Sequence, residues 1–354
     1  MRRLFCRLTL YSGFSAILLL VHASVLLAQV PKVKDFDLDS KRDRSVLFDM
    51  AVTPTSDVLS FVAKGTGNWE LYRASNWLGE TPSVKKLVLP GYFSRADSKR
   101  GEKALENLNA TVFVTRDGSY AVCVGSAEWL KRVKGWAVGS ATSDDVISVV
   151  DLSTFKIVAT TRTEKLDLFE FHGVDLDDEG YVRVGSSSSG KVRQAAFIRL
   201  SIPSLESGPK CAYNWIEDSP GKQHPQPTTD KECSEILKAR ALGDYLRGGQ
   251  VLSTQKVNVC ENNNSEFCHI PGEFTADGEF GVGSRSEGHD NIFGSYVTTS
   301  NSFIIFSSAR GVDIGEIKEP TNDSFRKKLT FLGGRDYLLV IESGTHLMAY
   351  ELRD

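Results

Sequence analysis

The chain has 354 residues, of which 41% are hydrophobic, 25% charged and 10% aromatic. This balanced composition excludes disordered, collagenous and coiled-coil proteins, because each of those classes uses a far more biased set of residues. The formal net charge is −3, whereas proteins that coat nucleic acid usually carry a basic excess. We therefore expect no nucleic-acid partner. The length accommodates one large domain or two ordinary ones, each with a sizeable core.

The N-terminus has the order of an export signal. Three arginines and no acid lie near the start, an apolar run follows from Ile17 to Leu27, and small residues stand at Ala23 and Ala28. This order predicts a cleaved signal peptide over residues 1–28 and a periplasmic or extracellular protein. An uncleaved membrane anchor over residues 11–30 is the alternative, because that stretch is just long enough to span a bilayer. No later segment approaches a membrane span.

Cysteine usage agrees with export. After Cys6 is lost with the signal, four of the five remaining cysteines cluster in one polar stretch and are the disulfide candidates: Cys211, Cys233, Cys260 and Cys268. Pairing between sequence neighbours would staple a segment with little core of its own, although all three pairings stay open. Cys123 lies in a strand-like run and is predicted to be a buried free thiol. A zinc site at Cys268 and His269 is the alternative, but no cysteine pair has the usual zinc-ligand spacing.

The chain contains an internal repeat. The tripeptide Val-Gly-Ser ends a short predicted strand at residues 124–126, 184–186 and 282–284, and looser versions occur at 63–65 and 342–344. The glycines of successive copies are 60, 60, 98 and 61 residues apart. The long interval contains all four clustered cysteines, so removing an insertion of about 38 residues restores the period. A fixed period of this kind indicates a repeat architecture.

Each repeat has the same internal order of a strand, a tight turn, a second strand that ends at the glycine, a connection, and a further hairpin. The predicted turns are at residues 54–57, 116–118, 178–180, 276–278 and 333–335. Most contain Asp-Gly or Gly-Gly steps, which supply the positive φ angles that short hairpins require. The second hairpin is clearest over 146–160. Four short antiparallel strands in each repeat correspond to one blade of a propeller.

This strand-turn-strand pattern, with Asp117-Gly118 and the stretch Val150–Val158, resembles the YVTN-type and WD-repeat-like propeller families. The resemblance implies an all-β fold with five recognisable four-stranded blades, or six or seven blades as alternative counts. Residues 29–354 would form this single domain. The repeats are longer than those families usually show and contain no Trp-Asp or Tyr-Val-Thr-Asn sequence, so the resemblance extends to the fold alone.

The ends of the chain predict how the ring is completed. The last repeat offers only three strands, over 328–332, 336–341 and 346–352. Near the N-terminus, residues 33–38 alternate apolar and charged side chains and precede the first complete repeat. We expect this segment to supply the missing strand, which would remove two open sheet edges. A frayed N-terminal arm is the alternative.

The segment 209–268 departs from the repeat. Lys231–Leu246 places apolar residues at helical spacing, with cap candidates before it and two glycines after it. We expect a disulfide-stapled, partly helical insertion, and a degenerate further blade is the alternative.

The predicted binding face is where the second and third strands of each repeat are joined. The expected connections are at residues 65–68, 125–145, 185–191, 283–290 and 343–345. Ser186 and Ser284 follow the repeated glycines, where spare backbone N–H groups suit an anion or a sugar. The longest connection interleaves aromatic and basic residues, and its binding candidates are Trp129, Lys131, Arg132 and Trp136. Such a surface suits a protein or glycan partner.

Two acidic runs resemble calcium loops but lack the final bidentate glutamate. Residues 175–180 have Ser186 at the twelfth position, and residues 35–39 have Val46 there. We expect a turn at the first run and an edge strand at the second.

Catalytic signals are weak. His289 and Asp290 are adjacent in one connection, where a carboxylate would orient a histidine base, and His172 lies in a first strand. Neither a nucleophile elbow nor a dinucleotide fingerprint is present. The sequence therefore predicts a non-enzymatic binding protein for a protein, peptide or glycan, with no cofactor. A lactonase-like propeller hydrolase or an oxidoreductase subunit with a divalent cation in a central site is the alternative.

Overall fold

The computed structural model describes residues 28–39, 47–63, 68–90, 103–133, 136–137, 142–166, 171–177, 179–187, 194–219, 222–225, 233, 273–275, 279–290, 296–307, 310, 312–318 and 325–353. Within these ranges the chain forms β-strands and one short 3₁₀ helix, η1 (Thr163–Leu166). The strands assemble into five sheets, and each sheet has at least four strands. The predicted all-β propeller fold is confirmed.

Blade 1 shows the common plan. Its strands β3 (Phe48–Val52), β4 (Val58–Ala63), β5 (Trp69–Ser75) and β6 (Ser83–Leu89) lie side by side in chain order, and every pair is antiparallel. The first three strands are mostly buried, whereas most of β6 is exposed. The burial pattern therefore distinguishes the inner strands of the blade from its outer edge.

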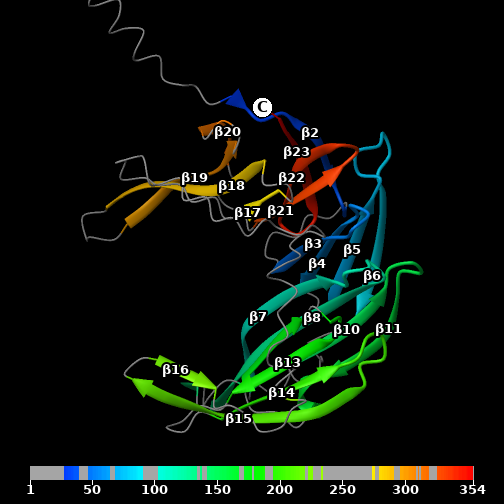
Figure 1. The fold of residues 1–354 in the computed structure, drawn as a ribbon, viewed down its shortest axis with the longest axis vertical. Helices are drawn as coiled ribbons and strands as arrows, with labels where there is room; N and C mark the ends of the chain where they lie inside the picture. Colours follow the sequence, from blue (N-terminus) through cyan, green and yellow to red (C-terminus); the bar gives the residue numbers. More distant parts are fainter. Residues whose placement is uncertain are drawn as a thin grey trace, which may run out of the picture.

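The other four blades follow the same plan. Blade 2 contains β7 (Lys103–Val114), β8 (Tyr120–Val133), β9 (Trp136–Ala137), β10 (Thr142–Asp151) and β11 (Lys156–Arg162); blade 3 contains β12 (Phe171–Leu176), β13 (Val182–Ser187), β14 (Gln194–Leu200), β15 (Ser207–Ser219) and β16 (Lys222–Pro225); blade 4 contains β17 (Glu273–Phe274), β18 (Phe280–Asp290), β19 (Tyr296–Ser307) and β20 (Val312–Lys318); blade 5 contains β21 (Phe325–Leu332), β22 (Arg335–Glu342) and β23 (His346–Leu352). Figure 1 shows the blades along an arc in the order 4, 5, 1, 2 and 3, so that blades 3 and 4 lie at its two ends.

Hydrophobic clusters join consecutive blades. Separate clusters lie between blades 1 and 2, blades 2 and 3, blades 4 and 5, and blades 5 and 1. The last of these brings the end of the chain against its beginning, as a ring requires. No described cluster joins blades 3 and 4, which are the two blades on either side of the predicted insertion.

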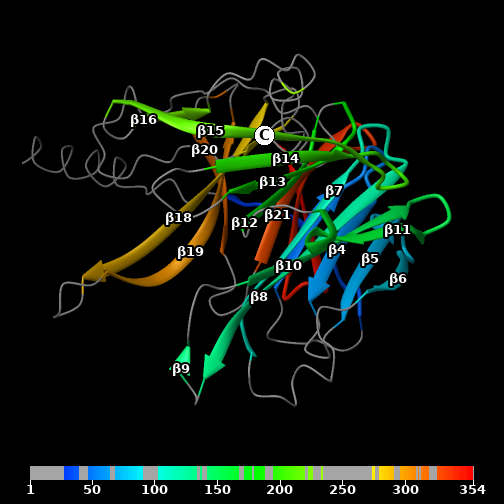
Figure 2. The same cartoon turned by 90° about the horizontal axis from the view of Figure 1, so that it is seen from below.

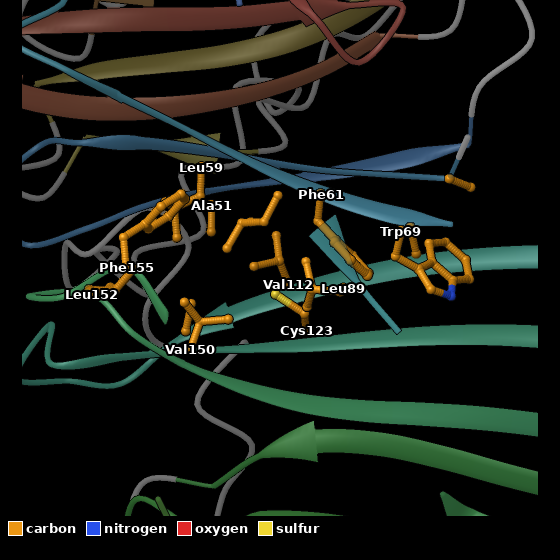
Figure 3. Close-up of a cluster of buried hydrophobic side chains, with 14 residues drawn as sticks. Ala51, Leu59, Phe61, Trp69, Leu89, Val112, Cys123, Val150, Leu152 and Phe155 are labelled. Atoms are coloured by element: carbon orange, nitrogen blue, oxygen red, sulfur yellow. The ribbon is translucent and has the colours of Figure 1, made fainter. Parts of the chain in front are cut away.

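Blades 1, 2 and 5 are covered on both faces by their neighbours, which explains why their strands are rich in Val, Ile and Leu. Successive side chains of a strand point to opposite faces of the sheet. In β8, Ala121 and Cys123 therefore pack toward blade 1, and Val122 and Val124 pack toward blade 3. Figure 3 shows Cys123 within the cluster between blades 1 and 2. Its thiol is free and buried, as predicted, and burial raises the pKa of Cys123 above its usual range.

The repeated glycines have a packing role at two positions. A Cβ atom on Gly125 would lie 2.3 Å from Cε2 of Trp69, whose indole belongs to the preceding blade. Gly344 has a φ of 74°, and its Cβ would lie 3.1 Å from Val62 and 3.3 Å from Phe48. At Gly185, by contrast, the nearest atom would be 3.9 Å away. The repeat thus marks close contacts between blades, although not at every copy.

The first hairpin turn of four blades is closed in the same way. In each, a Thr or Asp side chain accepts a hydrogen bond from a backbone N–H that lies four or five residues later, over 2.9 to 3.0 Å; the pairs are Thr53 with Asp57, Thr115 with Tyr120, Asp177 with Tyr181, and Thr275 with Phe280. Gly118, Gly180, Gly333 and Gly334 take the positive φ values predicted for these turns. Of the acidic run over 175–180, Asp175 and Leu176 therefore end β12, and Asp177 and Gly180 belong to the expected turn.

The N-terminal strand completes blade 5. Strand β2 (Lys32–Asp37) pairs antiparallel with β23 at the outside of that blade, and Leu38 then enters the cluster between blades 5 and 1. The edge-strand prediction is confirmed, and the alternative of a frayed arm is wrong. Strand β1 (Ala28–Gln29) pairs in parallel with Gly315 and Glu316 of β20. The segment therefore connects blades 4, 5 and 1, beginning at the last residue of the predicted signal.

The predicted insertion is stapled to blade 3. Cys211 of β15 and Cys233 form a disulfide with 5.6 Å between their Cα atoms, and both are buried beside Phe197. This confirms one of the two neighbour pairings. Cys260 and Cys268 lie outside the described residues, as do His269 and all of the predicted helix except Cys233. Among the described segments, no helix is long and apolar enough to cross a membrane.

Candidate functional site

The predicted binding face is formed where the second and third strands of each blade are connected. In blade 5 this connection is the tight turn Ser343–Thr345, where Ser343 and Gly344 both have positive φ. The Gly344 carbonyl accepts a hydrogen bond from Ser60 of blade 1 over 2.5 Å. In blade 1, residues 64–67 lie outside the described structure, and Asn68 is exposed. The turn in blade 5 is therefore fixed against its neighbour.

Two of the connections are β-ribbons, although the sequence analysis expected loops. Strands β8 and β10 pair from Tyr120–Asp151 out to Trp129–Thr142, and β18 and β19 pair from Phe280–Ser307 out to Asp290–Tyr296. The corresponding strands of blade 1 form a ladder of only six residue pairs. The second strand continues because it hydrogen-bonds to the third strand well beyond the repeated glycine. Local turn residues do not predict pairing of this kind, because it depends on the neighbouring strand. Figure 2 shows both ribbons projecting beyond the sheets.

The aromatic and basic candidates lie along the ribbon of blade 2. Trp129, Lys131 and Arg132 belong to β8, and Trp136 belongs to β9, where it is the pairing partner of Val133. The ladder between β7 and β8 reaches Lys131, which is opposite Lys103. The structure thus brings these candidates together on one paired element.

The remaining candidates lie in blades 3 and 4. His172 of β12 is opposite Ser186 of β13, so the backbone brings two of the predicted residues to the same pair of strands. Ser284 of β18 is opposite Phe303. His289 and Asp290 occupy the last two pairs of the β18–β19 ladder, in a different blade from His172. Their catalytic role stays a prediction.

An ionic network that the sequence analysis did not find fixes the N-terminal strand beside the turn of blade 5. His346, the first residue of β23, lies with Nδ1 2.8 Å from Asp37 Oδ1 and Nε2 3.1 Å from Asp35 Oδ1. The two ring nitrogens of His346 therefore face the two carboxylates of β2. Asp35 and Asp37 of the acidic run therefore lie on an edge strand and contact a histidine, whereas Asp39 follows the strand.

A second part of the network links the end of that segment to blade 1. The Tyr72 hydroxyl donates to Asp39 over 2.7 Å and also contacts Glu70, and Lys86 Nζ lies 2.8 Å from Glu70 Oε1. Burial of the phenol, together with its hydrogen bonds to Glu70 and Asp39, raises the pKa of Tyr72 above its usual range. The phenol therefore remains a hydrogen-bond donor between two carboxylates. The signal that the sequence analysis overlooked is a pair of opposite charges on neighbouring strands, Glu70 on β5 and Lys86 on β6.

Among the residues that the structure describes, no group of three or more His, Cys, Asp and Glu side chains is arranged to hold a metal ion.

Comparison with known proteins gives a limited result. No family model and no curated protein matches the chain. Among solved structures, an α-L-arabinanase mutant from Cellvibrio cellulosa is similar at 13% identity over 92% of this chain and 93% of that chain, with a TM-score of 0.25. The WD40 domain of SCAP from fission yeast is similar at 8% identity over 88% and 75%, with a TM-score of 0.20. Drosophila Plexin A in complex with Semaphorin 1b gives 13% identity over 86% and 73%, with a TM-score of 0.19.

These TM-scores are too low to support an argument about this chain. Its propeller architecture rests instead on five antiparallel sheets in chain order, on the clusters between them, and on the N-terminal strand that completes the last sheet.

Proposed function

We propose that this chain is an exported binding protein that uses the ribbons of blades 2 and 4 to hold a protein, peptide or glycan partner. The observation that carries the proposal is the pair of long ladders, β8–β10 and β18–β19, which extend the second and third strands beyond the length found in blade 1. At about 3.4 Å per residue, four extra pairs add roughly 14 Å. The propeller supplies the rigid base.

The chemistry of the blade 2 ribbon suits recognition. Trp and Arg are the residues most enriched among those that dominate binding energy at protein interfaces. A ladder holds Trp129 and Arg132 in one backbone conformation before the partner arrives, which lowers the entropic cost of binding. The proposal of export is supported by the disulfide between Cys211 and Cys233, because such bonds persist in oxidising compartments. Membership of the YVTN-type or WD-repeat-like families stays a prediction.

Trimming the ribbon tests the proposal. Ser126 and Asp145 face each other in the ladder, so residues 127–144 are replaced by Asn-Gly, which favours a two-residue hairpin. We expect the intact chain to show saturable binding to at least one member of a glycan and peptide array, and the trimmed variant to bind that member at least tenfold more weakly, a change of about 1.4 kcal/mol. The matched control is K85A/V88A on the exposed strand β6, which should bind as the intact chain does.

Equal binding by the intact and trimmed chains would contradict the proposal, and so would the absence of saturable binding to every probe. Binding in EDTA separates the proposal from the metal-dependent enzyme. We expect the affinity to be unchanged in EDTA. Stoichiometric uptake of Ca²⁺, Mn²⁺ or Zn²⁺ with turnover of a bound glycan would favour the enzyme instead.

A further inference from the structure

Strand β21 of blade 5 lies on the inner side of the propeller. It is the terminal strand of its sheet, on the opposite edge from β2, and it contacts β3, which is the corresponding strand of blade 1. Figure 1 shows β21, β3 and β7 toward the inside of the arc, and β6 and β11 toward its outside. Phe325, where β21 begins, is paired with Glu342, immediately before the turn over 343–345. The start of β21 therefore lies at the same end of the blade as the predicted binding face.

Three consecutive basic residues occupy the start of this strand, and they divide between its two faces. The Lys327 ammonium lies 4.9 Å from the centre of the Phe303 ring in blade 4. On the opposite face, the Arg326 guanidinium lies 5.4 Å from the centre of the Phe48 ring in blade 1. Thr330, further along that face, has its hydroxyl 3.4 Å from Ser56 of blade 1. By the alternation of strand side chains, Lys328 lies on the same face as Arg326 and Thr330.

Neither Arg326 nor Lys328 has an acidic partner in the described structure. Arg326 is exposed and donates one hydrogen bond, over 2.9 Å, to the backbone carbonyl of the neighbouring Phe325. Lys328 is half-buried, and within the described ranges its ammonium makes no hydrogen bond or ion pair. Other arginines on the described blade strands do pair with a carboxylate, among them Arg73 with Asp57, Arg183 with Asp175 and Arg199 with Asp177.

Two positive charges on one face of a strand, about 7 Å apart, repel each other unless an anion lies between them. We propose that Arg326 and Lys328 form an anion subsite on the inner strand of blade 5, which takes a carboxylate or sulfate group of a ligand. The planar guanidinium matches an oxyanion through two parallel N–H groups, and the ammonium adds a point charge. The guanidinium of Arg326 carries five N–H groups, and the described structure shows one hydrogen bond from them, to the Phe325 carbonyl. The subsite does not depend on the ribbons proposed above.

The test compares anion binding by the full chain and by charge-removed variants at constant ionic strength. The probes are sodium sulfate, trigalacturonate as a carboxylate source, and a neutral trisaccharide of the same size. Isothermal titration is expected to show binding of at least one anionic probe, with none for the neutral sugar. R326Q/K328Q should bind that probe at least tenfold more weakly, and each single variant at least threefold more weakly. K85Q/K156Q removes the same charge from the exposed strands β6 and β11, so it should bind normally.

Three results would overturn the subsite. They are no binding of either anionic probe, binding by R326Q and K328Q as tight as that of the intact chain, and a loss in K85Q/K156Q equal to that in R326Q/K328Q. If the double variant does not fold, the single variants decide the question. The chain with a trimmed blade 2 ribbon should keep its affinity for the anion. Failure of the ribbon proposal and failure of the anion subsite are thus separate outcomes.

Discussion

Replacing Gly125 with alanine is expected to lower the free energy of unfolding by about 3 kcal/mol. The new methyl carbon would lie 2.3 Å from the Trp69 indole, which is 1% exposed and stacks on Phe61 with 5.2 Å between ring centres. Because the indole has no free space, the two blades must separate or the backbone must shift, and overpacking of this kind costs about 1–3 kcal/mol or more. Urea unfolding followed by tryptophan fluorescence measures the change.

Gly185 provides the matched control. It occupies the equivalent place in the repeat, but its added methyl carbon would have no neighbour closer than 3.9 Å. G185A is therefore expected to change the free energy of unfolding by less than about 0.5 kcal/mol. Equal effects of G125A and G185A would contradict the packing of blade 1 against blade 2 at this position.

Removing the closing strand is expected to have a larger effect. A chain that begins at residue 40 lacks β2 and Leu38, and it exposes the edge of β23 together with part of the cluster between blades 5 and 1. Full burial of one large apolar side chain contributes about 1.5–3 kcal/mol, and each net hydrogen bond adds about 1 kcal/mol. We expect a loss of at least 5 kcal/mol, roughly the total stability of many domains, and a loss of cooperative unfolding in calorimetry.

A chain that begins at residue 28 keeps the whole segment and is the control. It should unfold in one cooperative transition at the temperature of the chain that begins with Met1. If the chain beginning at residue 40 unfolds at that same temperature, β2 does not stabilise the ring.

The predictions that succeeded rest on features repeated along the chain. Each copy of Val-Gly-Ser lies on the second strand of its blade, and the turn glycines take positive φ, so the order of the blades was predictable from local residues. The predicted end of that strand at the glycine is wrong in blades 2 and 4, where pairing continues to Trp129 and Asp290. The last repeat lacked one strand, and the alternating segment 33–38 was correctly predicted to supply it, because β2 pairs with β23. The sequence left three cysteine pairings open, and the disulfide between Cys211 and Cys233 is one of the neighbour pairings among them.

There is a physical reason why the ribbons could not be predicted from the sequence. The charged and glycine-containing stretches after Gly125 and Gly283 have the composition of loops, yet their backbones pair with the following strand. Strand formation there depends on the partner edge, which is far along the chain, more than on the residues themselves. The candidates Trp129 and His289 were correctly taken as part of the connections, but the type of element was wrong.

The basic start of β21 was also missed. That strand was predicted to begin at Lys328, whereas it begins at Phe325. In the structure these residues pair with β22 while their sheet edge faces the interior of the arc.

The side chains that close the first turn of four blades were also missed. They are Thr53, Thr115, Asp177 and Thr275. Alignment of the repeats against one another would have revealed that a Thr or Asp recurs at this place.

Whether the two ends of the chain share one sheet is tested most directly by an engineered crosslink. Lys34 of β2 and Ala349 of β23 are directly paired, and cross-strand Cα distances fall within the range that a disulfide spans. We predict that K34C/A349C forms this bond almost completely during oxidative folding, as seen by peptide mass mapping, whereas K34C/K156C, with its second cysteine on blade 2, does not. Free thiols at both positions of K34C/A349C in the folded protein, or equal crosslinking of the two pairs, would contradict the closed ring.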